Sequence, residues 1–181
     1  MGTKDRLEIV RAAIRRCDKR RVAVDVGAHA GRWSTILAQN FYSVMAFEPV
    51  PENCRAWTER VKAPNATLFE RAVGNIDGKC RIEGPGNSKY WRAIPDEAGP
   101  VDMMRLDSLR LWDVDLIKTD CEGDDTWALL GAVETIIRCQ PVVVVEFVPE
   151  RDEISPITVM EKLGYQLVET IDVDHVLAPG A

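Results

Sequence analysis

The chain has 181 residues, enough for one domain with a substantial hydrophobic core, and we expect residues 1–181 to form a single domain. Its formal net charge of −6 argues against a broad nucleic-acid-binding surface, and its two histidines are too few for a histidine-rich metal site. No apolar run is long enough to span a membrane, and five cysteines without a C-x-x-C pair are typical of reduced thiols, so we expect a cytoplasmic protein.

The first part of the chain alternates helices with short strands. Residues 1–20 hold a predicted helix at 5–17, because apolar residues recur there at helical spacing. The next expected elements are a strand at 21–26, a helix at 33–39, a strand at 43–47, a helix at 52–61 and a strand at 67–73.

The second part resumes this alternation after an interruption. Residues 79–107 carry a cluster of turn residues, and we expect an irregular insertion there with a strand at 101–106. The later elements are expected to be a strand at 114–119, a helix at 126–138, a strand at 142–147, a helix at 157–163 and a closing hairpin of 165–171 with 175–177. This order predicts an α/β fold with helices on both faces of a mostly parallel sheet, to which the hairpin adds one antiparallel strand.

A glycine-containing turn, D-V-G-A-H-A-G at 25–31, follows the first predicted strand. A dinucleotide site needs the spacing G-x-G-x-x-G, and here His29 stands where the middle glycine would approach a pyrophosphate. The acid Asp25 followed by Gly27 is closer to the opening of S-adenosylmethionine-binding folds, in which the acid and the turn face the amino-acid end of the cofactor. The alternative is an ordinary tight turn. We expect cofactor contacts from Asp25, Gly27, Ala28, His29 and Gly31.

Glu48 ends the second predicted strand, 17 residues after Gly31. A carboxylate in this place can accept hydrogen bonds from both hydroxyls of a ribose, and the alternative is a solvated strand-end residue. Pro49 follows it and is counted with the cofactor-binding residues. Ala72 and Val73 end the third strand, where small and apolar side chains suit the flanks of an adenine.

An acidic block, D-C-E-G-D-D at 120–125, follows the strand at 114–119. Sheets of this kind bind ligands beyond the carboxyl ends of their strands, so Asp120 and Glu122 are assigned to the site. Asp124 fits helix N-capping better. Glu146 lies near the end of a neighbouring strand and is expected to pair with Lys118, because a lone buried carboxylate would be costly.

Together these motifs resemble the FkbM-type S-adenosylmethionine-dependent methyltransferases. The matching segments, in the order of that family, are D-V-G-A-H-A-G at 25–31, F-E-P-V-P-E-N at 47–53, R-A-V-G at 71–74, R-L-D-S-L at 105–109, D-L-I-K-T-D-C-E-G at 115–123 and V-V-E at 144–146. The resemblance implies a Rossmann-like class I methyltransferase fold with a seven-stranded sheet. It also implies methyl transfer, usually to a hydroxyl of a sugar, a polyketide or another small natural product.

The resemblance also implies a role for each matching residue. Asp25, Gly27 and Gly31 would form the cofactor loop, and Glu48 would bind the ribose. Ala72 and Val73 would lie beside the adenine, and Asp120 with Glu122 would lie at the methyl-transfer end. The chain departs from the family at Asp125, where glutamate is more common.

An alcohol acceptor benefits from a base that takes its proton. Asp120, Glu122 and Glu146 are the candidates for this catalytic role, and the sequence does not choose among them. His29 is not favoured, because a turn residue more often packs or hydrogen-bonds locally. These acids could instead hold Mg²⁺, an interpretation that we do not favour because acid-rich strand ends also occur without a metal.

Other functions share some of these features. An NAD-dependent oxidoreductase would share the first strand and Glu48 but not the glycine spacing. A methyltransferase acting on nucleic acid or protein, and a cofactor-binding scaffold without turnover, are further alternatives. We expect a small-molecule hydroxyl acceptor as partner, without nucleic acid or membrane, and we make no prediction of the oligomeric state.

The aromatic segment at 87–92 has two interpretations. It either overhangs the site as an acceptor platform, with Lys89 and Arg92 facing an anionic group, or forms a hairpin that packs Trp91 on the sheet edge.

Overall fold

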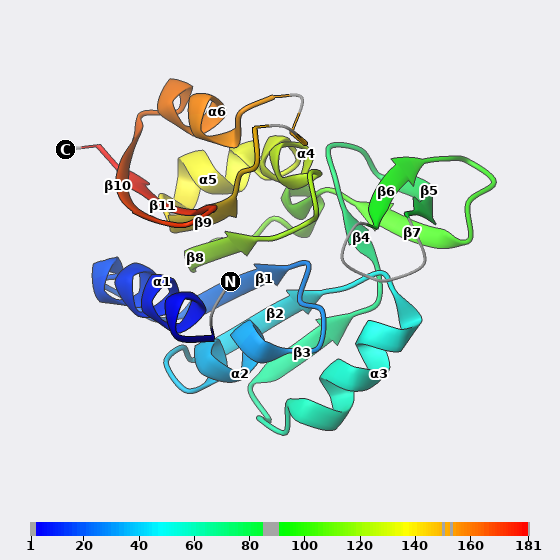
Figure 1. Cartoon of the computed structure of the whole chain (residues 1–181), viewed down its shortest axis with the longest axis horizontal. Coiled ribbons are helices and arrows are strands. Elements are labelled where there is room, and N and C mark those ends of the chain that lie inside the picture. Colours follow the sequence, from blue (N-terminus) through cyan, green and yellow to red (C-terminus); the bar gives the residue numbers. More distant parts are fainter. Residues whose placement is uncertain (1–2, 85–90, 150, 153, 181) are drawn as a thin grey trace.

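The computed structural model describes residues 3–84, 91–149, 151–152 and 154–180, and residues 3–7 by their backbone alone (Figure 1). Its helices are α1 (Thr3–Arg16), α2 (Arg32–Ala38), α3 (Pro51–Arg60), α4 (Asp125–Leu130), α5 (Val133–Cys139), α6 (Pro156–Lys162) and the 3₁₀-helix η2 (Leu106–Leu109). Within the described part of the chain, none of the helices is both long and apolar enough to cross a bilayer.

Seven strands form the main sheet, in the order β10-β11-β9-β8-β1-β2-β3. Only β11 runs antiparallel to its neighbours in this sheet, which confirms the expected mostly parallel sheet with one antiparallel strand. The strands are β1 (Val22–Val26), β2 (Ser43–Phe47), β3 (Ala66–Phe69), β8 (Val114–Thr119), β9 (Val142–Glu146), β10 (Tyr165–Ile171) and β11 (Asp174–Pro179).

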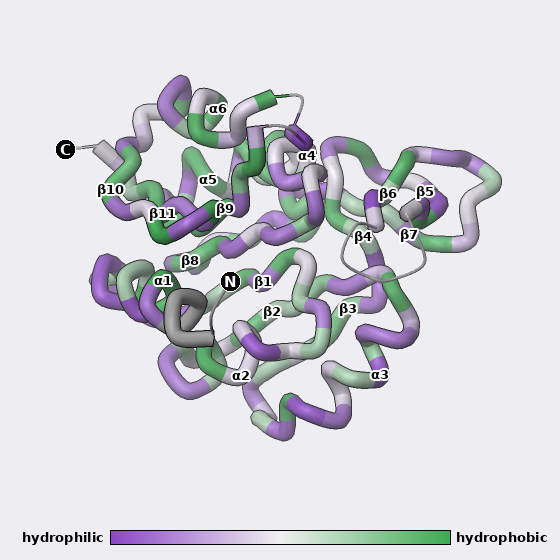
Figure 2. Tube along the Cα trace, in the orientation of Figure 1, coloured by the Kyte–Doolittle hydropathy of each residue, from purple (hydrophilic) through white to green (hydrophobic). Residues whose placement is uncertain are grey.

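Helices cover both faces of this sheet, because the central strands are apolar on both sides. Helices α1 and α2 pack with alternate residues of the strands, such as Ala23 and Val44, and α3 packs beside them on Ala46. Helices α4, α5 and α6 pack on the other face, with Val24 and Val143. Figure 2 shows hydrophobic and hydrophilic residues alternating along the covering helices, as this one-sided burial requires.

The expected strand at 67–73 is wrong as one element, because the chain leaves the main sheet after Phe69. β4 (Ala72–Val73) pairs instead with β7 (Val101–Met104).

The insertion at 79–107 is more regular than expected. It adds β5 (Gly78–Glu83) and β6 (Arg92–Pro95), and the four strands form a small sheet in the order β4-β7-β5-β6 around Ala72, Cys80 and Met103.

The single helix expected at 126–138 is divided into α4 and α5. Gly131 ends α4 in close contact with the backbone, since a Cβ there would lie 1.9 Å from the carbonyl oxygen of Gly74. The Asp107 carboxylate then accepts hydrogen bonds from the backbone N–H of Thr135 (2.8 Å) and from its hydroxyl (2.8 Å), which holds the first turn of α5.

Candidate active site

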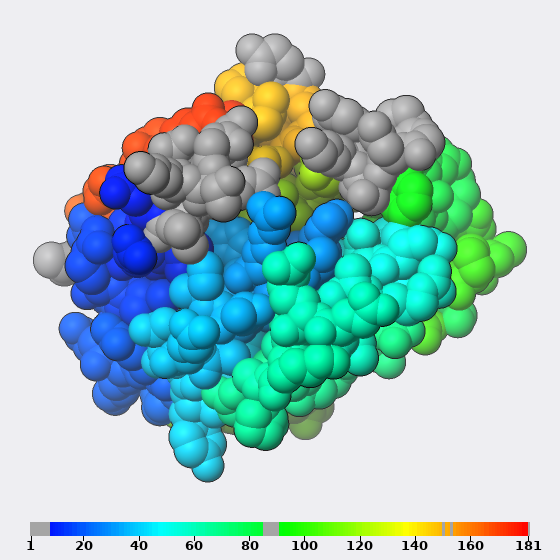
Figure 3. All heavy atoms as spheres, turned by 60° about the horizontal axis from the view of Figure 1, so that its bottom comes forward, coloured from blue at the N-terminus to red at the C-terminus, as the bar shows by residue number. Residues whose placement is uncertain are grey.

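A cavity of about 890 Å³ lies at the carboxyl ends of β1, β2, β8 and β9. Figure 3 shows the surface hollowed between the blue segment that contains α2 and the yellow segment after β9. Of the residues that the sequence assigned to the site, those in contact with the cavity are Gly27, Ala28, His29, Glu48, Pro49, Ala72, Val73, Asp120, Glu122 and Glu146. Asp25 and Gly31 do not line it.

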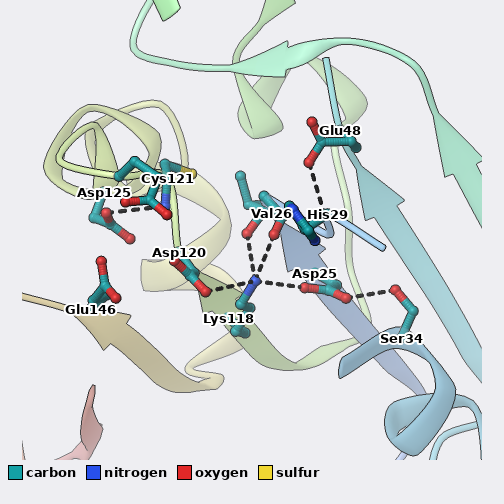
Figure 4. A network of polar contacts seen from close by, with 12 residues as sticks. Asp25, Val26, His29, Ser34, Glu48, Lys118, Asp120, Cys121, Asp125 and Glu146 are labelled. Carbon is teal, nitrogen blue, oxygen red and sulfur yellow. Dashed lines mark hydrogen bonds and ion pairs between the residues drawn. The ribbon is translucent and has the colours of Figure 1, made fainter. Parts of the chain in front are cut away.

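A buried ion pair between Asp25 and Lys118 lies beneath the turn. The two residues are partners in the β1–β8 register, and their carboxylate and ammonium groups are 3.1 Å apart (Figure 4). Lys118 also donates to the carbonyls of Val26 (3.1 Å) and Gly27 (2.9 Å). Burial opposes the lysine charge, but the nearby carboxylates of Asp25 and Asp120 outweigh it and raise the pKa of Lys118.

The expected pair between Lys118 and Glu146 is wrong. Lys118 is aligned with Val144 across the β8–β9 register, and its ammonium group turns toward β1 instead. Glu146 pairs with Arg151, which follows β9 (2.6 Å).

The glycine-containing turn is held between the ends of β2 and β8. Gly27 has φ +69°, and a Cβ there would lie 2.0 Å from the carbonyl oxygen of Asp120, so only glycine fits. Its N–H donates to the carbonyl of Phe47 at 3.0 Å. Gly31 also has positive φ. A Cβ there would collide with the side chains of Val61 and Trp57, so a glycine at this position lets α3 pack closely against the turn.

Glu48 is buried and holds the second side of the turn. Its Oε1 accepts from the N–H of Val50 (2.9 Å) and from the Asn53 amide (3.2 Å), and its Oε2 accepts from the N–H of His29 (2.8 Å). A carboxylate oxygen accepts about two hydrogen bonds. Counting the described residues, Oε2 is therefore the oxygen with remaining capacity for a ligand hydroxyl, whereas the sequence suggested both oxygens.

Arg151 joins two of the three candidate catalytic acids. Its guanidinium group lies 3.0 Å from Glu122 and 2.6 Å from Glu146, and Asp152 is a third partner at 3.3 Å. Asp120 lies 3.9 Å from the ammonium group of Lys118, a weaker contact. The role of Arg151 was not predicted from the sequence, because Arg151 lies in a loop and no periodic pattern there indicates its ion pairs.

The two acids that end the block 120–125 have different surroundings. Asp124 occupies the N-cap position of α4 but makes no side-chain capping bond, which corrects the capping expectation; its carboxylate instead pairs with Arg92 at 2.9 Å. Arg92 is therefore already neutralised. Asp125 is buried and accepts from the N–H of Cys121 (3.2 Å); burial, with the charge of Asp120, raises the pKa of Asp125 to about 8.

Trp91 lines the cavity, whereas Lys89 and the rest of 87–90 lie outside the described residues. Over the residues that are described, no three His, Cys, Asp or Glu side chains are grouped to hold a metal ion. Glu122 and Glu146 face a guanidinium group, so this donor set does not fit Mg²⁺.

The methyltransferase FkbM domain matches residues 25–167. The structure is similar to methyltransferase FkbM from Methylobacillus flagellatus, with a TM-score of 0.58 and 19% identity over 88% of this chain and 43% of that one. This chain thus spans less than half of that protein. A search of curated protein sequences gives no match.

Two further solved structures cover nearly the whole chain. An rRNA methylase from Streptococcus thermophilus has a TM-score of 0.61 and 12% identity, over 100% of this chain and 99% of that one. Precorrin 8W decarboxylase from Methanobacterium thermoautotrophicum has a TM-score of 0.63 and 15% identity, over 100% and 91%. At these identities the similarity establishes a shared Rossmann-like class I methyltransferase fold.

Replacing Lys118 tests the buried pair. Lys118→Met keeps the aliphatic stem and leaves the Asp25 charge buried without a cation, so we expect the free energy of unfolding in urea to fall by about 3–5 kcal/mol. The control is Lys79→Met, which breaks an exposed pair with Asp102 and is expected to lower the free energy of unfolding far less. Equal losses for the two variants would contradict a structural role of the buried pair.

Replacing Asp125 tests its raised pKa. Since the folded protein keeps this carboxyl protonated while the unfolded chain ionises it near pH 4, its contribution to stability falls as the pH rises toward about 8. Asp125→Asn removes this dependence. The free energy of unfolding of the variant, relative to that of the wild type, should therefore rise by on the order of 1 kcal/mol per pH unit between pH 5 and pH 8. Urea unfolding at several pH values measures the difference. The exposed Glu59→Gln should follow the wild type, and a constant offset between Asp125→Asn and wild type would refute the shift.

Replacing Gly27 tests the close approach of the turn to β8. Gly27→Ala places a methyl group on the backbone of Asp120, whereas Gly164→Ala, also at positive φ, meets nothing within 4 Å. We expect thermal unfolding to show a clearly larger loss of stability for Gly27→Ala. Similar losses would mean that backbone strain alone, and not the contact with β8, requires the glycine.

Proposed function

Since this chain belongs to the FkbM methyltransferase family, we propose that it transfers the methyl group of S-adenosylmethionine to a hydroxyl of a small-molecule acceptor, such as a sugar or polyketide. The observation that carries the proposal is the meeting of the turn at 27–29, Glu48 and Asp120 at one cavity. Parallel strands bring their carboxyl ends to one edge, where folds of this kind bind adenosine-containing cofactors.

The residues present fit this cofactor. Oε2 of Glu48 has capacity for a ribose hydroxyl, and the buried, apolar Ala72 and Val73 suit an adenine. The carboxylate of Asp120 suits the positive end of the cofactor. When bound, S-adenosylmethionine supplies an electrophilic methyl group on a sulfonium that departs as a thioether.

Among the three candidate bases, Asp120 is best suited to take the acceptor proton. The guanidinium group of Arg151 lies 3.0 Å from Glu122 and 2.6 Å from Glu146, so both of these carboxylates are engaged in close ion pairs. Asp120 lines the cavity, and its nearest cation among the described residues, Lys118, is 3.9 Å away. The protein's main contribution is then to align acceptor and cofactor, with Asp120 holding the released proton.

A nucleic-acid acceptor is not proposed, because the chain carries a net charge of −6 and a phosphate backbone requires a basic surface. The missing middle glycine of the turn likewise disfavours NAD.

Replacing Glu48 tests the cofactor site. Glu48→Gln removes the charged acceptor, and we expect calorimetry to show about 10- to 100-fold weaker S-adenosylmethionine binding than in the wild type. The exposed Glu52→Gln is the matched control on α3. Thermal unfolding of both variants identifies any loss of folding.

Transfer of a labelled methyl group to a panel of hydroxyl compounds then tests the reaction. Methylation of a sugar or phenol hydroxyl supports the proposal. Absence of S-adenosylmethionine binding, or tighter binding of NAD than of S-adenosylmethionine, would contradict the proposal.

A further inference from the structure

The small sheet contributes an apolar wall to the cavity. Ile82 of β5, Ala93 of β6 and Trp91 just before β6 line it, as does Val148 after β9. These side chains come from elements other than those that carry the proposed cofactor-binding residues Gly27, Glu48, Ala72 and Val73. The cavity therefore holds an apolar surface that the cofactor assignment does not use.

A buried carboxylate attaches this wall to the acidic block. Asp124 accepts hydrogen bonds from Nε of Arg92 (3.0 Å) and from the N–H of Ala93 (2.7 Å), and its side chain is only 10% exposed. Asp124 is also four residues from Asp120, so these bonds fix the position of Trp91 and Ala93 relative to the proposed proton acceptor.

The same end of the cavity carries an excess of negative charge. Its lining carboxylates are Asp120, Glu122, Asp124 and Glu146. Among the described residues, Arg92 and Arg151 are the guanidinium groups paired with these acids, so this cluster of four acids and two arginines carries 2 − 4 = −2. Lys118 is offset by Asp25, and within the described part of the chain the other arginines of the cavity lining, Arg32, Arg60 and Arg71, form no ion pair with the four acids. A negatively charged acceptor would be repelled here.

We propose that this wall and Val148 form the acceptor subsite, that it takes an uncharged or cationic hydroxyl compound with an apolar ring face, and that Asp124 is the positioning residue that holds it. The assignment as an acceptor subsite rests on the proposed methyl transfer. Aromatic and aliphatic side chains bind a ring face by burying its apolar area, and Trp91 adds stacking.

Matched probes test the preferred acceptor class. Calorimetry in the presence of S-adenosylhomocysteine compares 2-naphthol with 6-hydroxy-2-naphthoate, which has the same ring and an added carboxylate. We expect 2-naphthol to bind at least about 10-fold more tightly, which corresponds to about 1.4 kcal/mol. Equal or tighter binding of the naphthoate, or no binding of 2-naphthol, overturns the proposal.

Variants test the wall and its attachment. Trp91→Ala and Asp124→Asn should each weaken 2-naphthol binding about 10-fold and change S-adenosylhomocysteine binding less than about 2-fold. Trp91→Phe should retain most of the affinity for 2-naphthol. Asp96→Asn is the control, because it removes an exposed ion pair with Arg81 elsewhere on the small sheet and should change neither affinity.

The outcomes distinguish a failure of the acceptor subsite from a failure of the cofactor site. If S-adenosylhomocysteine binds but Trp91→Ala and Asp124→Asn leave 2-naphthol binding unchanged, the subsite is refuted and the cofactor site stands. If the wild type binds no S-adenosylhomocysteine, the proposed function fails, and titration of 2-naphthol into the free protein decides the subsite by the same variants. Thermal unfolding shows which variants retain the fold.

Discussion

The buried pair of Asp25 and Lys118 is the interaction on which the rest of the site depends. It joins β1 to β8 at the point where both strands end, and the lysine also holds the carbonyls that begin the turn. The other carboxylate oxygen of Asp25 accepts from Ser34 of α2 (2.6 Å), and Ser34 accepts from Trp57 of α3 (2.8 Å). One ion pair thus connects two strands and two helices below the cavity.

The acids around the cavity differ more in their partners than in their positions. Glu122 and Glu146 share Arg151, Asp124 pairs with Arg92, and burial raises the pKa of Asp125 to about 8. These partners compensate only part of the charge that the sequence concentrates at the strand ends.

The sequence predicted the main sheet, its antiparallel strand and the family, and most of the residues that it assigned to the site line the cavity. These features depend on periodicity and on the shared edge of parallel strands, both of which are local or topological signals. The predicted partner of Lys118 was wrong, because the true partner depends on the register of β8 with β1 and β9. The pairing of the small sheet was missed because it arises from contacts between separate segments, and Arg151 was missed because it lies in a loop without a periodic pattern.

The two ends of the small sheet lie side by side. The chain enters it at β4 and leaves it at β7, and these strands are paired, with the N–H of Gly74 donating to the carbonyl of Met104 (3.0 Å). Asp77 closes the junction by accepting from Arg105 (2.9 Å) and Ser108 (2.7 Å). A segment with adjoining ends can be exchanged or lengthened during evolution without moving β1 or β8. Acceptor choice is thereby free to diversify among descendants of this fold while the machinery beneath the turn stays the same.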